Sequence, residues 1–166
     1  MMNPDGSGLA RLTSMEFYNR ANEREMYSAD QRFRAMSRKD RENGTAGLNQ
    51  IFYNDYFYSS LTQLTKFGAG TAWDPAWSPT SETVAFVSNE SNNDEIFVIK
   101  KGEWPAQQLT RNDYEWDHHP SWTPDGTQIL FSSNRISGKR QRWIMDADGG
   151  NQRQFSNFPL EVWNTI

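Results

Sequence analysis

Short apolar runs separated by polar turns recur along the second half of the chain. Residues 83–88, 96–99 and 129–133 are runs of strand length that are rich in Val, Ile and Phe. Between them lie turn signals, the clearest of which is Thr123-Pro-Asp-Gly126, where proline presets φ and glycine tolerates a positive φ. Short runs of β-branched and aromatic residues bounded by such turns predict buried β-strands.

These strands belong to an internal repeat. Residues of the same type recur 45 positions apart, by subtraction of their numbers: Pro75 and Pro120, Trp77 and Trp122, Pro79 and Pro124, Phe86 and Phe131. A fixed spacing over several unlike residue types indicates a structural repeat. Each unit holds two strands, a turn and two more strands, and four short strands in about 45 residues fit one blade of a β-propeller.

The repeat divides the chain. Residues 66–110 and 111–156 are two complete predicted blades. Residues 1–13 align on the end of the second blade, and we interpret them as the closing hairpin of a preceding blade. Residues 157–166 lead into a next blade. The predicted fold class is therefore all-β, with four-stranded antiparallel blades in a ring that is incomplete or completed by a partner.

Residues 14–65 match the repeat poorly, and one interpretation is a divergent blade. Residues 27–30 then stand for the Trp-Ser-Pro-Asp turn, residues 33–37 for the second strand and residues 50–53 for the third. A long polar loop separates those two strands in this interpretation.

The alternative is a helical insertion over residues 14–42. Thr13-Ser-Met-Glu16 has a capping-box pattern, and apolar residues recur at a spacing of three to four along this segment. The separation of Leu12 from Leu64 is 52 residues by subtraction, close to one period, and this favours the blade.

The repeat resembles that of TolB-type β-propellers, which are relatives of the WD-repeat proteins. The resemblance rests on Pro-x-Trp-Ser/Thr-Pro-Asp-Gly, the following Ile-x-Phe-x-Ser strand, and the Asp-Gly and Leu-Thr further on. There are departures: Thr80-Ser81 replaces Asp-Gly, and Arg142 stands 45 residues after Phe97. The resemblance implies a periplasmic or other extracytoplasmic protein that works with envelope partners.

Composition narrows the functional classes. The net charge is −4, which argues against a general nucleic-acid binder, because such a protein needs a basic stripe. There is no cysteine, so disulfides and thiolate metal sites are excluded. Apolar runs are too short for a membrane span, and the first residues lack the apolar core of a signal peptide.

A propeller blade places the loop before its first strand and the loop between its second and third strands on one face. We expect the former at 67–74 and 111–119, and the latter from Asn89 and Asn134 onward. Residues 114–119 combine aromatic, carboxylate and imidazole groups. The predicted partner-binding residues are Trp73, Asp74, Tyr114, Trp116, Asp117, His118, His119 and Arg135.

A purely structural role is an alternative for the same segment, since Asp117 or His119 could pair only with backbone or with Arg135. A metal site at His118-His119 is disfavoured, because neighbouring strand residues point to opposite faces. Residues 146–149 lack the later ligands of an EF-hand loop and predict a hairpin turn. We expect no metal and no cofactor.

The sequence supports no catalytic class, since it contains no Gly-x-Ser-x-Gly, phosphate-binding Walker loop or His-Glu-x-x-His. We predict a non-catalytic protein- or peptide-binding propeller module. The alternative is the non-catalytic propeller portion of a serine peptidase related to prolyl oligopeptidases.

Two structural expectations complete the prediction. Trp77, Trp122, Phe86 and Phe131 should pack between blades, and Trp116 should be more exposed than Trp122. Because three blades leave strand edges and an apolar flank uncovered, we expect the isolated chain either to self-associate, for example as a pair that forms a six-blade ring, or to be poorly soluble.

Overall fold

The computed structural model describes residues 24–40, 47–113, 116–136 and 138–155. Within these ranges the chain forms three antiparallel sheets. The first contains β1 (Phe33–Lys39), β2 (Asn49–Asp55) and β3 (Ser60–Gln63); the second β4 (Ala72–Trp77), β5 (Thr83–Ser88), β6 (Glu95–Lys100) and β7 (Gln107–Gln108); the third β8 (Asp117–Trp122), β9 (Gln128–Ser133), β10 (Gln141–Asp146) and β11 (Arg153–Gln154). The predicted all-β fold is confirmed.

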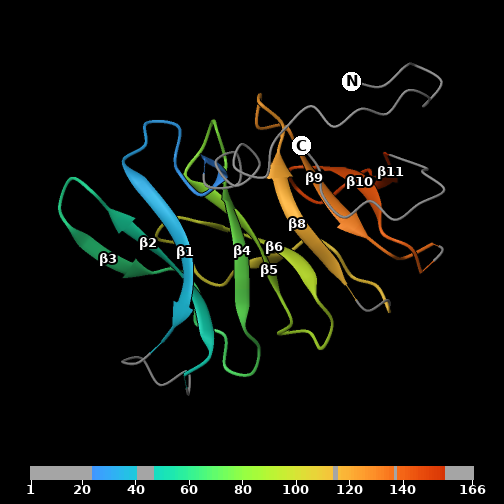
Figure 1. Ribbon diagram of the computed structural model, residues 1–166, viewed down its shortest axis with the longest axis horizontal. Coiled ribbons are helices and arrows are strands. Elements are labelled where there is room, and N and C mark those ends of the chain that lie inside the picture. Colours follow the sequence, from blue (N-terminus) through green and yellow to red (C-terminus); the bar gives the residue numbers. More distant parts are fainter. Residues whose placement is uncertain (1–23, 41–46, 114–115, 137, 156–166) are drawn as a thin grey trace, which may run out of the picture.

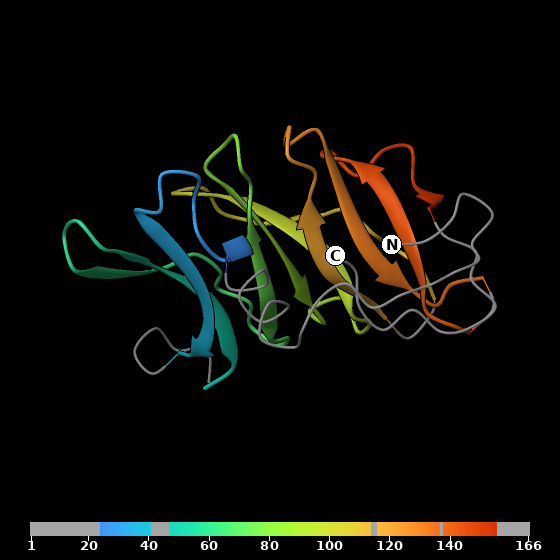
Figure 2. The ribbon, with the colours of Figure 1, turned by 45° about the horizontal axis from the view of Figure 1, so that its top comes forward.

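The sheets stand side by side in chain order, as blades of a propeller do, and they do not close into a ring (Figures 1 and 2). Strand order within each sheet follows chain order, so every connection is a hairpin. β4 packs against β8, and β1 packs against β4. The first strands of the second and third sheets are therefore neighbours at the inner edge of the array.

The segment with two interpretations, 14–65, contains β1 to β3 in its described part. The turn before β1 also follows the repeat. The Ser28 hydroxyl donates to Asp30 Oδ1 at 2.6 Å and accepts the amide of Phe33 at 3.0 Å. Thr123 makes the equivalent two bonds in the third sheet. The predictions for 1–13 and 157–166 lie outside the described residues.

Apolar side chains fill the two spaces between the sheets. Between the first and second sheets, Trp77 is stacked on Phe33 with ring centroids 5.6 Å apart, and Phe86 is fully buried. Phe131 is fully buried between the second and third sheets with Trp143. Burial of one such ring is worth about 1.5–3 kcal/mol. The middle strands are buried on both faces, which explains their continuous apolar sequences.

In each of the first two sheets, a buried threonine just after the last strand hydrogen-bonds to residues of the preceding strand. The Thr110 hydroxyl accepts the amide of Ile96 at 2.8 Å and donates to Glu95 Oε2 at 2.5 Å. Thr65 lies 45 residues earlier and donates to Gln50 at 2.7 Å. We call these two arrangements the threonine clasps. They explain the threonine of the Leu-Thr pairs at 64–65 and 109–110.

Residues 72–74 and 117–119 were expected in loops, and this expectation was wrong. They belong to β4 and β8, whose pairing continues past a β-bulge with register shifts at Trp73/Ala76 and His118/Ser121. The extra residues take a left-handed conformation, with φ of 55° at Asp74 and 54° at His119. A β-bulge accommodates an extra residue in one strand, so that the hydrogen-bonded pairing of the two strands continues beyond it.

The assignment of Arg142 to the position of Phe97 was also wrong. Phe97 pairs with Phe86, whereas the residue that pairs with Phe131 is Trp143. The loop between β9 and β10 spans 134–140 and is one residue longer than the corresponding loop, 89–94. This insertion shifts the second half of the repeat from a spacing of 45 to 46.

The expected burial of Trp122 is wrong, since Trp122 is half-buried, as Trp116 is. The indole Nε1 of Trp122 donates to the carbonyl of Ala76 at 3.1 Å, and one edge of the ring stays open to solvent. Trp116 is covered by the guanidinium of Arg140, 4.0 Å from its ring centroid.

Candidate functional site

Predicted site residues from two sheets meet where β4 and β8 begin. Asp74 and His119 occupy the same repeat position. Asp74 Oδ2 accepts the His119 amide at 3.1 Å and lies 2.8 Å from its Nδ1. The two left-handed bulges thus face each other across the sheet boundary. The His119 side chain remains 44% exposed, so this pair is available to a partner.

His118 is the centre of the cluster. Its Nε2 lies 2.7 Å from Asp94 Oδ2, and its ring is 4.5 Å from Trp116 and 5.9 Å from Trp73, centroid to centroid. The backbone carbonyl of Asp94 also accepts a hydrogen bond from the amide of residue 117 at 2.7 Å. This bond holds the loop after β5 against the start of β8. Asp94 was not predicted as a site residue, because its role depends on this contact between sheets.

We use the name junction cluster for Trp73, Asp74, Asp94, Trp116, His118 and His119. It presents half-buried aromatic rings beside carboxylate and imidazole groups. Such mixed aromatic and polar surfaces are typical of protein recognition sites.

Asp117 and Arg135 do not belong to an accessible surface. Asp117 is 0% exposed, and its Oδ2 forms an ion pair with Arg135 and accepts a bond from Asn112 at 3.1 Å. The structural alternative therefore accounts for these two residues: a carboxylate this deeply buried needs its partner. Tyr114 lies outside the described residues.

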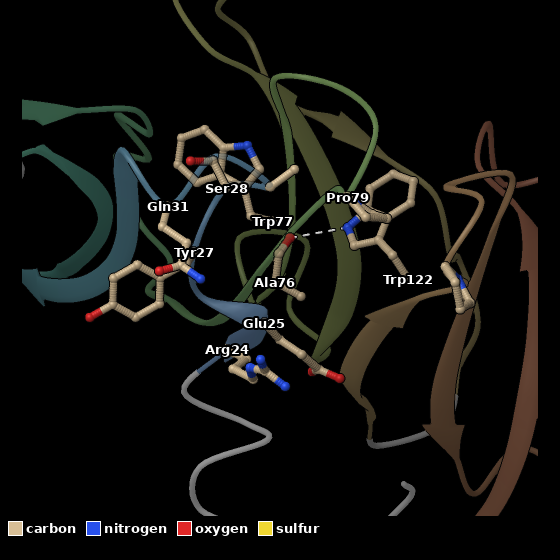
Figure 3. A pocket seen from close by; sticks show the side chains of 11 residues that line it. Arg24, Glu25, Tyr27, Ser28, Gln31, Ala76, Trp77, Pro79 and Trp122 are labelled. Carbon is tan, nitrogen blue, oxygen red and sulfur yellow. Dashed lines mark hydrogen bonds between the residues drawn. The ribbon is translucent and has the colours of Figure 1, made fainter.

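A cleft of about 590 Å³ opens at the opposite ends of the same strands. Figure 3 shows Tyr27 and Trp122 on either side of it and Ala76 between them, with Arg24 and Glu25 below in this view. The sequence interpretation assigned Trp77 and Trp122 only to the packing between blades. Trp77 is 4% exposed and does pack, yet its edge also lines the cleft.

Glu25 is the cleft residue that the sequence interpretation missed most clearly. Its Oε1 accepts the hydroxyl of Ser121 at 2.7 Å. Burial raises the pKa of Glu25, and the nearby Asp74 acts in the same direction, while the Ser121 bond, Arg142 and His119 oppose the rise. Its position two residues before Tyr27, where the other repeats have proline, was an available signal.

In the described part of the chain, no three His, Asp or Glu side chains converge as metal ligands would. The same residues include no helix that is long and apolar enough to cross a membrane.

Comparison with known proteins places the chain among propellers. The TolB β-propeller domain family matches residues 49–159, which is 111 of 166 residues. The protein TolB homolog of Chlorobium luteolum is 33% identical over 114 residues, 69% of this chain and 24% of that protein. The uncharacterized peptidase YuxL of Bacillus subtilis is 27% identical over 95 residues, 54% of this chain and 14% of the peptidase.

The structure of a putative TolB from Agrobacterium tumefaciens superposes with a TM-score of 0.65 at 21% identity, covering 77% of this chain and 46% of that one. The chain thus spans a quarter or less of the two curated relatives, and the structural likeness shows the fold. With the family match, the repeat and the three sheets in agreement, the chain belongs to the TolB β-propeller domain family.

Proposed function

We propose that this chain is a non-catalytic propeller module that binds a protein or peptide partner through the junction cluster. The observation that supports this most is a pair of contacts across a sheet boundary: the His118 ring, which also contacts Trp116, lies against Trp73, and His119 pairs with Asp74. A partner seated there would contact two blades at once. The half-buried indoles would supply apolar area, and the exposed imidazole of His119 would supply hydrogen bonds.

The resemblance to TolB-type proteins also supports an extracytoplasmic location with envelope proteins as partners. Nucleic acid is not expected as a partner, given the net charge of −4. We further propose that copies of the chain associate, because the turn after β2 leaves Phe57 and Tyr58 exposed at 75% and 68%. Light scattering at increasing concentration tests this last point, and a stable monomer throughout would contradict it.

The test of the binding role compares proteins captured from a bacterial envelope extract by the wild-type chain and by Trp116→Ala. The matched control is Trp104→Ala, because Trp104 is 43% exposed and lies in the turn between β6 and β7, away from the junction cluster. We expect a partner that Trp104→Ala retains and Trp116→Ala loses. With that partner purified, Trp116→Ala should weaken binding at least about tenfold.

Thermal melts of both variants separate lost binding from lost folding. If Trp116→Ala remains folded and captures the same proteins in the same amounts as the wild type, the junction cluster is not the binding surface.

The alternative function is the propeller portion of a serine peptidase. It is supported by the match to the YuxL peptidase, which covers 54% of this chain. Sequencing the parent gene distinguishes the two: a downstream α/β-hydrolase domain would favour the peptidase, and further propeller blades alone would favour the binding module.

A further inference from the structure

Equivalent turns from three successive units line the cleft together. Its lining has an aromatic residue at one repeat position, which is Tyr27 before β1, Trp77 at the end of β4 and Trp122 at the end of β8. Two residues later the lining residue is Ala29, Pro79 or Pro124. A surface made from equivalent positions of successive blades runs along the inner edge of the array. Its aromatic lining lies at the ends of β4 and β8, whereas the junction cluster lies near their beginnings, although Glu25 is close enough to Asp74 and His119 to interact with them electrostatically. A ligand bound in the cleft goes beyond the function proposed above.

One residue breaks this repetition. Two positions before the aromatic residue, the second and third blades have Pro75 and Pro120, whereas the first has Glu25. The glutamate adds a carboxylate to a lining that is mainly aromatic and apolar, with Arg24, Ser28 and Gln31 as its other polar members. Its Oε1 is held by Ser121, and among the described residues its Oε2 accepts no hydrogen bond. A carboxylate turned toward a cleft with one oxygen unengaged is suited to a cationic ligand group.

The aromatic walls favour the same kind of ligand. Indole and phenol rings attract a cation over their faces, most strongly where water is partly excluded. The cleft, at about 590 Å³, has room for a long basic side chain and the peptide backbone that carries it. We propose that the cleft binds an arginine or lysine side chain of a peptide, with Glu25 as its counter-ion and Tyr27, Trp77 and Trp122 as its aromatic surround.

Neighbouring charges shape this site. Asp74 adds to the negative potential at Glu25, while His119 and Arg142 reduce it. Arg24 lines the same cleft, and its positive charge opposes the entry of a cationic group. Removing the charge of Arg24 should therefore strengthen the binding of a basic peptide, which a purely apolar groove would not do.

The experiment titrates the capped tripeptide acetyl-Gly-Arg-Gly-amide into the nitrogen-15-labelled chain. The control peptide carries citrulline, which has nearly the shape of arginine and no charge. The indole N–H signal of Trp122 is the reporter. We expect a saturable shift with the arginine peptide and at least about tenfold weaker binding of the citrulline peptide. Equal binding of the two peptides, or an unsaturable shift, overturns the proposal without any variant.

Glu25→Gln then tests the named residue and keeps an acceptor for the Ser121 hydroxyl. It should remove the preference for arginine over citrulline, whereas Glu103→Gln, at an exposed carboxylate in the turn after β6, should not. A folded Glu25→Gln chain that keeps the preference refutes the assignment. Trp116→Ala should leave the titration unchanged, so failure here and failure of the junction cluster are distinguishable.

Discussion

Thr110→Val removes one hydroxyl and almost no volume from a threonine clasp. The buried amide of Ile96 then loses its acceptor, and an unsatisfied buried group costs about 1–3 kcal/mol. Glu95 loses its shortest hydrogen bond, and such a bond to a charged acceptor is worth about 1.5–3 kcal/mol. Asn112 still donates to Glu95, at 3.0 and 3.2 Å, and compensates in part. We expect the free energy of unfolding to fall by about 3 kcal/mol.

Urea denaturation followed by tryptophan fluorescence measures this change. Thr127→Val is the matched control, because Thr127 is exposed and its hydroxyl bonds only to Asp125 in a surface turn. It should cost less than about 1 kcal/mol. Thr65→Val, where the partner is the neutral Gln50, should cost an intermediate amount. If Thr110→Val costs no more than Thr127→Val, the clasp is not a source of stability.

Three other changes test the packing and the buried charge. Burial raises the pKa of Glu95, so its carboxyl favours folding while protonated and loses that contribution as pH rises through the folded-state pKa. The advantage of Glu95→Gln over the wild type should thus grow between about pH 4 and about pH 7 in urea titrations; an advantage independent of pH would contradict this. Trp77→Ala should cost about 3–5 kcal/mol in thermal melts and Trp122→Ala clearly less, because only Trp77 is fully enclosed; equal costs would count against the burial described. Gly70→Ala would place its Cβ 2.4 Å from the backbone of Glu90 and should cost about 1–3 kcal/mol, whereas an unchanged urea midpoint would show that the loops separate freely.

Much of the fold could be predicted because the repeat fixes it locally. The spacing between Trp77 and Trp122 and the apolar middle strands determine strand type, and both are visible without any contact information. The one-residue insertion between β9 and β10 was not visible, because a loop of 134–140 differs from 89–94 only once the pairing of Phe131 with Trp143 is known. The bulges were missed because proline after Asp74 suggested that the strand had not yet begun.

The candidate site was predictable only in part. Trp116, His118 and His119 stood out by residue type, and the structure does bring them together with Trp73 and Asp74. Residue type alone could not show that Asp117, a carboxylate like Asp74 in the same segment, is buried and does not belong with them. The cleft was not predicted because its aromatic residues Tyr27, Trp77 and Trp122 are 50 and 45 residues apart in sequence. They come together only at the inner edge of the array.

The contact between Asp74 and His119 joins equivalent positions of consecutive blades, and the aromatic packing between sheets also joins consecutive blades. The hydrogen bond between Glu25 and Ser121 reaches from the first sheet's segment to the third, and it is an exception to this pattern. Stability in such an array is close to a sum of nearest-neighbour terms. Among the described sheets, the middle one has neighbours on both sides and the outer two have one each. The stability of each sheet against local unfolding should therefore decline from the middle sheet to the outer two. In native-state hydrogen exchange, the amides of β5 and β6 should be the last to exchange, and those of β1 to β3 should open earlier by partial unfolding.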